Sequence, residues 1–213
     1  MRFLCLHGMG TSSKILQMQT AALRHELGDD HTYEFVEEIA HISNPDVPHY
    51  QYFALNAHSY LRALDQLETY LAIHGPFDGV LGFSQGAEFA LMYLIRHIHI
   101  YPGEPLPFKV CVLLSRIGVY DPACWLDTGR AVSLVEMPKG LSKIRIPVAA
   151  VWGEKDWEIT KNESLATSGL IDEEFIWAFV HGGGHEIPGP SINGSVSGAV
   201  KVIRRAVTQA QMV

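Results

Sequence analysis

The stretch Phe77–Ala90 reads FDGVLGFSQGAEFA, and it predicts the central turn of the fold. Its first half is a short apolar run typical of a buried strand, and its second half has the apolar spacing of a helix. Between the halves, Ser84 is flanked by Gly82 and Gly86, which allow strand and helix to approach closely at a sharp turn. We therefore expect the Ser84 hydroxyl at the carboxyl edge of a sheet, where helix N–H groups favour a developing negative charge.

The chain on both sides of this turn alternates apolar runs with amphipathic stretches. The expected strands are Arg2–Gly8, Thr32–Ile39, Phe77–Phe83, Phe108–Leu114, Ile144–Gly153 and Glu173–Val180. The expected helices are Ile15–Leu27, Ser59–Ile73, Gln85–Ile98 and Gly198–Gln209. In the fifth strand, Pro147 should confine pairing to the residues that follow it. This order predicts an α/β fold, with a mainly parallel sheet of about six strands and helices on both faces.

No internal repeat or linker divides the chain, so residues 1–213 are expected to form one domain. Two long segments, His41–His58 and Gly118–Gly140, lack a clear pattern. Compact domains rarely carry long loops without a purpose, so both are candidates for a substrate wall or a lid. Short helices within them are the alternative.

Composition excludes several classes of function. The formal net charge of −7 disfavours nucleic acid or an anionic membrane as the main partner. No apolar run approaches the roughly 20 residues that a membrane-spanning helix needs. The N-terminus lacks the apolar region and cleavage site of a secretory signal, and the three cysteines have no metal-binding spacing. A cytoplasmic protein without cofactor or metal is expected.

A serine nucleophile needs a base, and four histidines follow Ser84 in the chain. His97 and His99 fall at the end of a predicted helix and are expected at the surface. His181 and His185 bracket the glycine-rich HGGGH after the last predicted strand, at the same sheet edge as Ser84. We favour His185, because it lies further into the loop, whereas His181 adjoins the strand and can pack or support the site.

The acid that orients this base is expected after the preceding strand, in VWGEKDW. Asp156 lies a few residues beyond that strand and is the favoured candidate. Glu154 is its nearest competitor but suits a solvated loop position. Asp121 follows an earlier strand and would need an unusual placement.

Two backbone amides are expected to form an oxyanion hole. One is that of Gln85, the residue after the serine, and the other is that of Met9 in the loop LHGMGTS after the first strand. His7 in the same loop is expected to brace it, because a base that precedes Ser84 breaks the usual order of serine, acid and histidine.

These motifs together resemble the α/β-hydrolases and, more narrowly, the fungal FSH family of small serine hydrolases. The likeness covers FLCLHGMGTSSKILQMQTAALRHEL, FDGVLGFSQGAEFA, IPVAAVWGEKD and HGGGHEIP. The last fits the family's HxGGHxxP pattern, which implies that His185 is the base and that His181 organises its loop. Two segments depart from the family, namely the compact stretch 41–59 and RIGVY after the fourth strand.

The family includes thioesterases that release polyketides from fungal synthases, so the resemblance implies hydrolysis of an ester or acyl thioester. The partner would be a small-molecule ester or an acyl carrier protein domain of a polyketide synthase. Alternatives are a carboxylesterase, an acyltransferase or cyclase, and a ligand-binding protein that has lost turnover. Five aromatic residues are candidates for an apolar acyl wall, with core packing as the alternative: Tyr50, Tyr52, Phe53, Trp125 and Trp157.

Overall fold

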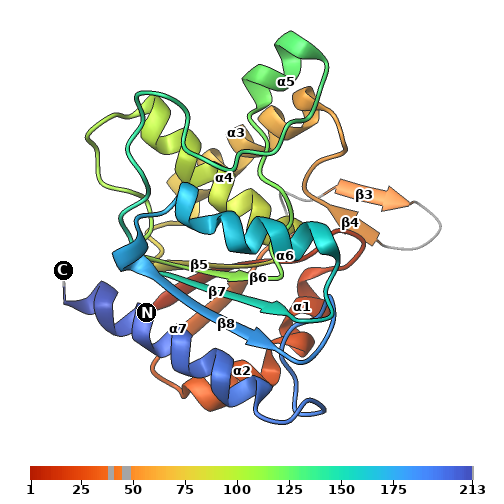
Figure 1. The fold of residues 1–213 in the computed structure, drawn as a ribbon, viewed down its shortest axis with the longest axis vertical. Helices are drawn as coiled ribbons and strands as arrows, with labels where there is room; N and C mark the ends of the chain where they lie inside the picture. The colour runs from red at the N-terminus through yellow and green to blue at the C-terminus, as the bar shows by residue number, and fades with distance from the viewer. Residues whose placement is uncertain (38–40, 45–48, 213) are drawn as a thin grey trace.

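The computed structural model describes residues 1–37, 41–44 and 49–212. Its main feature is a parallel sheet with strand order β2-β1-β5-β6-β7-β8 (Figure 1). The strands of this sheet are β1 (Arg2–Leu6), β2 (Thr32–Phe35), β5 (Gly79–Phe83), β6 (Val110–Leu114), β7 (Val148–Gly153) and β8 (Ile176–His181). The α/β class and the six-stranded parallel sheet expected from the sequence are thus confirmed.

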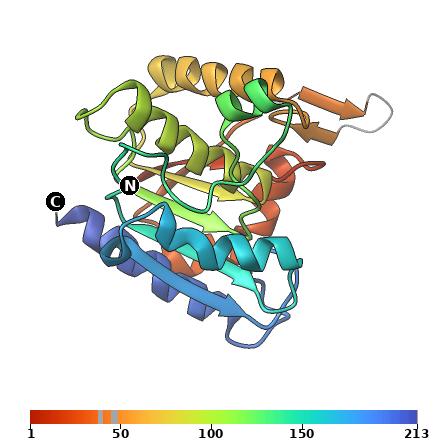
Figure 2. The ribbon, with the colours of Figure 1, turned by 45° about the horizontal axis from the view of Figure 1, so that its top comes forward.

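Helices cover both faces of the sheet, as Figures 1 and 2 show. One face carries α3 (Ala57–His74), α4 (Gln85–Ile100) and α6 (Glu158–Leu165), and the other carries α1 (Ser13–Gln19), α2 (Ala21–Leu27) and α7 (Ser195–Gln211). The helix α5 (Pro122–Thr128) packs beside α3, and short 3-10 turns occupy Ala166–Gly169 and Glu173–Phe175. The structure therefore has three layers, with an apolar core on each side of the sheet.

The central strands β5, β6 and β7 are buried along their whole length. Strands covered on both faces read as continuous apolar runs rather than alternating ones, which explains why their sequences were easy to assign. Pairing between β6 and β7 begins at Val148, directly after Pro147, as expected for a residue without a backbone N–H. Because all six strands are parallel, their carboxyl ends lie at one edge.

Three elements differ from the sequence prediction. The first helix is two helices, broken where the Thr20 hydroxyl donates to the Leu16 carbonyl at 2.8 Å and competes with the regular backbone bonds. The last strand begins only at Ile176, after the 3-10 turn Glu173–Phe175. The helix α6 was not predicted.

The two long segments contain secondary structure of their own. In the first, β3 (His41–Asn44) and β4 (His49–Gln51) form an antiparallel pair, so strands are present where short helices were the alternative. The segment was also a candidate for a substrate wall or a lid, and its residues 45–48 lie outside the described residues. In the second segment, Gly118–Gly140, α5 is a short helix of the kind given as the alternative. Within the described residues, no helix is long and apolar enough to cross a membrane.

Candidate active site

The turn from β5 to α4 holds Ser84 at a positive φ, with φ 52° and ψ −115°. Non-glycine residues rarely adopt positive φ, and such strain is found at functional sites. The packing around the turn explains its flanking glycines. A Cβ on Gly82 would lie 2.4 Å from the Gly86 carbonyl oxygen, and one on Gly86 would lie 2.2 Å from that of Leu6. Larger residues would force α4 away from β1 and β5.

Ser84 is joined to two of its predicted partners by hydrogen bonds. Its Oγ lies 2.9 Å from Nε2 of His185, and Nδ1 of the same imidazole lies 2.8 Å from Oδ1 of Asp156. The Asp156 carboxylate is fully buried and the imidazole nearly so, with 13% of its surface exposed. A Nδ1–H donated to Asp156 leaves Nε2 free to accept the serine proton, which is the tautomer a general base needs.

Backbone hydrogen bonds connect the loop that carries Asp156 to the loop that carries His185. The Glu154 amide donates to the His181 carbonyl at 2.8 Å, and the Lys155 amide donates to the Gly183 carbonyl at 2.9 Å. Gly153 makes this possible, since a Cβ there would lie 2.4 Å from the same Gly183 oxygen. Asp156 and His185 therefore belong to one joined pair of loops at the ends of β7 and β8.

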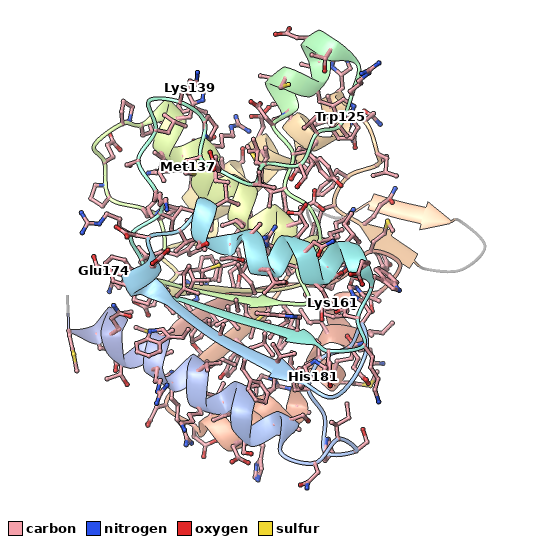
Figure 3. The ribbon with its side chains drawn as sticks, viewed as in Figure 1. Trp125, Met137, Lys139, Lys161, Glu174 and His181 are labelled. Atoms are coloured by element: carbon pink, nitrogen blue, oxygen red, sulfur yellow. The ribbon has the colours of Figure 1, made fainter. Side chains whose placement is uncertain are left out.

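His181 lies at the end of β8, where Figure 3 labels it, and is buried. Its Nδ1 accepts a hydrogen bond from the Gly183 amide at 3.1 Å, which stabilises the turn leading to His185. Burial lowers the pKa of His181 and keeps the ring neutral, as this acceptor role requires. The contact fits the loop-organising role implied by the family resemblance.

The two alternative acids lie in other settings. Asp121 is the N-cap of α5, where its Oδ1 accepts hydrogen bonds from the Ala123 and Cys124 amides. Glu154 is exposed to solvent. Of the three carboxylates weighed from the sequence, Asp156 is the one that contacts the histidine.

The loop after β1 lies against the serine. A Cβ on Gly8 would lie 3.3 Å from the Ser84 Cβ, so the residue before Met9 packs against Ser84. Thr11 stabilises this loop, because its hydroxyl donates to the Gly8 carbonyl at 2.7 Å. Gln85 is the first residue of α4, and its amide is one of the helix N–H groups that have no intrahelical acceptor.

Side chains beneath the site support this arrangement. Gln85 accepts a hydrogen bond from the Tyr52 amide and donates one to the Phe53 carbonyl, each at 3.0 Å, so its side chain also stabilises the neighbouring segment. His7 is buried, its ring packs against that of Tyr52 with centroids 4.7 Å apart and planes inclined by 30°, and its Nδ1 donates to the Gly8 carbonyl at 2.8 Å. Burial lowers the pKa of His7, in keeping with the bracing role expected for it.

The five candidate wall aromatics occupy different environments. Tyr52 and Phe53 are buried in the core and pack against Phe89, so core packing, the alternative to a wall role, applies to both. Trp125 lies on α5, apart from His181 in Figure 3, and Tyr50 is half-buried. Trp157 is 59% exposed and stacks on the His185 ring, a contact that the sequence did not indicate.

A second cluster that was not predicted lies behind the serine, between α4 and α6. Arg116, from the RIGVY segment, is 2% exposed and forms an ion pair with Glu163 at 3.3 Å. Glu88, one helical turn after Ser84, is 1% exposed, and burial raises its pKa to about 8. The sequence marked RIGVY as a departure from the family pattern, but it did not indicate this cluster.

The fold and the hydrogen-bonded serine, histidine and aspartate define the chain as an α/β-hydrolase. Solved structures with this architecture include esterase PE8, which is 24% identical over 96% of this chain and 92% of its own, with a TM-score of 0.63. Arabidopsis thaliana SOBER1 is 16% identical over 97% of this chain and 98% of its own, with a TM-score of 0.59.

The model of the FSH1 serine hydrolase family matches residues 1–191, and the chain belongs to this family. A relative over the whole length is the esterase FPY3 of Fusarium mangiferae, which is 37% identical over 99% of this chain and 98% of its own. The protein is therefore a serine hydrolase of the esterase type.

Proposed function

We propose that the chain cleaves an ester or thioester through an acyl-enzyme on Ser84. The Ser84 oxygen attacks the carbonyl carbon while Nε2 of His185 takes its proton, and Asp156 stabilises the resulting imidazolium. The tetrahedral oxyanion accepts hydrogen bonds from the Met9 and Gln85 amides. The proton then passes from His185 to the departing alcohol or thiol, and water, activated by the same histidine, hydrolyses the acyl-enzyme.

The observation that carries this proposal is the continuous chain of hydrogen bonds from Ser84 through His185 to Asp156. The strained backbone of Ser84 at the start of α4 supports the same assignment, because it directs the hydroxyl out of the sheet edge. A ligand-binding protein without turnover would not need all three groups in contact.

We further propose an acyl thioester on a carrier protein as the substrate, with a polyketide chain as the acyl group. The resemblance to the polyketide-releasing thioesterases supports this choice. Met9, whose side chain is 56% exposed, follows Gly8 in the loop beside Ser84 and suits an apolar acyl group. A free small-molecule ester is the second candidate, because the relative FPY3 is named an esterase. A cytoplasmic location remains a prediction.

The test compares wild type with Ser84→Ala on matched oxygen esters and N-acetylcysteamine thioesters. We expect turnover that depends on Ser84 and favours the thioesters, whereas a preference for oxygen esters would support the second candidate. Substantial activity in Ser84→Ala would contradict the nucleophile assignment. If both proteins are inert, mass spectrometry after fluorophosphonate treatment shows whether Ser84 reacts, and an unlabelled wild type would favour a protein without turnover.

A further inference from the structure

We propose that Trp157 is a positioning residue for His185, whose indole holds the imidazole in place and stabilises its protonated form. The inference rests on the proposed function, because it concerns the base of that reaction. It also differs from the wall role considered for Trp157 from the sequence.

The geometry of the two rings supports this role. Their centroids are 3.9 Å apart and their planes are inclined by 12°, so they stack face to face. Phe83 contacts the same imidazole at 5.3 Å and 38°, which adds a second aromatic neighbour. An imidazole packed in this way can rotate little out of the plane that joins Ser84 to Asp156.

The backbone of Trp157 contributes to the same dyad. Its amide donates a hydrogen bond at 2.6 Å to Asp156 Oδ1, the oxygen that also contacts His185 Nδ1. Among the described residues the other carboxylate oxygen, Oδ2, has no hydrogen-bond partner. One residue therefore places both the carboxylate, through its amide, and the imidazole, through its indole.

The chemistry of the reaction gives the stacking a further consequence. Each proton that His185 takes from Ser84 or from water makes it a cation, in a site where 13% of its side chain is exposed. The face of an indole attracts a cation within about 6 Å more strongly than any other aromatic side chain. Of the side chains that contact this imidazole in the described residues, Asp156 is the titratable one, Ser84 contributes a hydroxyl, and Trp157 and Phe83 add uncharged rings.

The exposure of the Trp157 side chain distinguishes a positioning role from a role in the stability of the fold. Trp157 is 59% exposed, so its replacement leaves no sealed cavity in the core. A leucine at this position keeps apolar bulk and the backbone amide but removes the aromatic face. Phenylalanine restores a smaller aromatic face and is the conservative variant. Leu165→Ala is the matched control, because Leu165 is an apolar residue 69% exposed at the far end of α6.

The test measures kcat, KM and the pH profile with p-nitrophenyl acetate, whose acyl group is too short to need a wall. We expect Trp157→Leu to lower kcat about threefold or more at unchanged KM, the rate equivalent of an exposed cation–π contact. The acid limb of kcat/KM should move to lower pH by about 0.5. Trp157→Phe should recover part of both changes, and Leu165→Ala should match wild type in both measurements and in thermal midpoint.

Two results would overturn the inference. One is a Trp157→Leu variant with wild-type kcat and pH profile on the acetate. The other is a defect confined to the KM of p-nitrophenyl octanoate, which would make Trp157 a wall residue. Neither result affects the proposed function, which fails instead if Ser84→Ala retains its activity.

Discussion

Glu88→Gln tests the unusual burial of a carboxyl group behind the nucleophile. Burial raises the pKa of Glu88 from its ordinary value of 4.5 to about 8, although Tyr60 and Arg116 favour the ionised form. At neutral pH the folded protein therefore holds Glu88 protonated, whereas the unfolded chain ionises it. A carboxyl group with a raised pKa stabilises the fold below pH 4.5 and loses that contribution as pH rises towards 8.

The size of the effect follows from this interval. Each pH unit between the two pKa values changes the free energy of unfolding by about 1.4 kcal/mol, so the ionisation costs the wild type about 3 kcal/mol by pH 7. Glutamine has nearly the same shape and does not titrate. The stability of Glu88→Gln relative to wild type should therefore increase with pH by about 1.4 kcal/mol per unit.

The assay is urea unfolding of both proteins at several pH values between about 5 and 8, followed by far-UV circular dichroism. The decisive quantity is the difference between the two free energies of unfolding, because the other titrating groups cancel in it. Glu26→Gln, on the exposed side of α2, is the surface control. A Glu88→Gln difference that stays constant with pH would refute the reasoning, since Glu88 would then titrate alike in both states.

Three further changes test the site. Asp156→Asn should lower kcat by about 10³- to 10⁴-fold, because the histidine loses the partner that sets its tautomer; an undiminished rate in steady-state assays would transfer the role to another carboxylate. Gly86→Ala should lower the free energy of unfolding in urea by about 1–3 kcal/mol, because its Cβ would lie 2.2 Å from the Leu6 carbonyl oxygen. In the control Gly189→Ala, the Cβ would lie 3.9 Å from its nearest neighbour, so little stability should be lost. Treatment with EDTA should leave the esterase rate unchanged, because the proposed mechanism uses only groups of the chain, and a loss restored by zinc would contradict it.

The sequence predicted the central strands and the elbow well because their signals are local. Continuous apolar runs mark β5, β6 and β7, and the elbow is marked by a short local motif, Ser84 between Gly82 and Gly86. The close contact that explains Gly86 is with Leu6 of β1, far away in the sequence. The break at Thr20 was missed because the apolar spacing continues across it. At the break the Thr20 hydroxyl donates to the Leu16 carbonyl, a contact that an apolar pattern does not reveal.

The helix α6 was missed for a different reason. Its buried residues are Thr160, Glu163 and Ser164, which give no apolar stripe of helical period. This polar face is buried because Arg116 lies beneath it and forms an ion pair with Glu163. The apolar pattern of one segment cannot reveal a helix whose buried polar face forms an ion pair with an arginine from a distant loop.

The stacking of Trp157 on His185 depends on backbone geometry that no side-chain motif encodes. HGGGH and VWGEKD each indicate a candidate residue, but the distance between base and acid comes from the amides of Glu154 and Lys155, which donate to the opposite loop. Gly153 lets the two loops approach to this distance, because a Cβ there would lie 2.4 Å from the Gly183 carbonyl oxygen. Once the loops are joined, the residue after the acid has its side chain against the base. The motifs thus predict which residues are candidates, and the paired loops determine how Asp156, Trp157 and His185 meet.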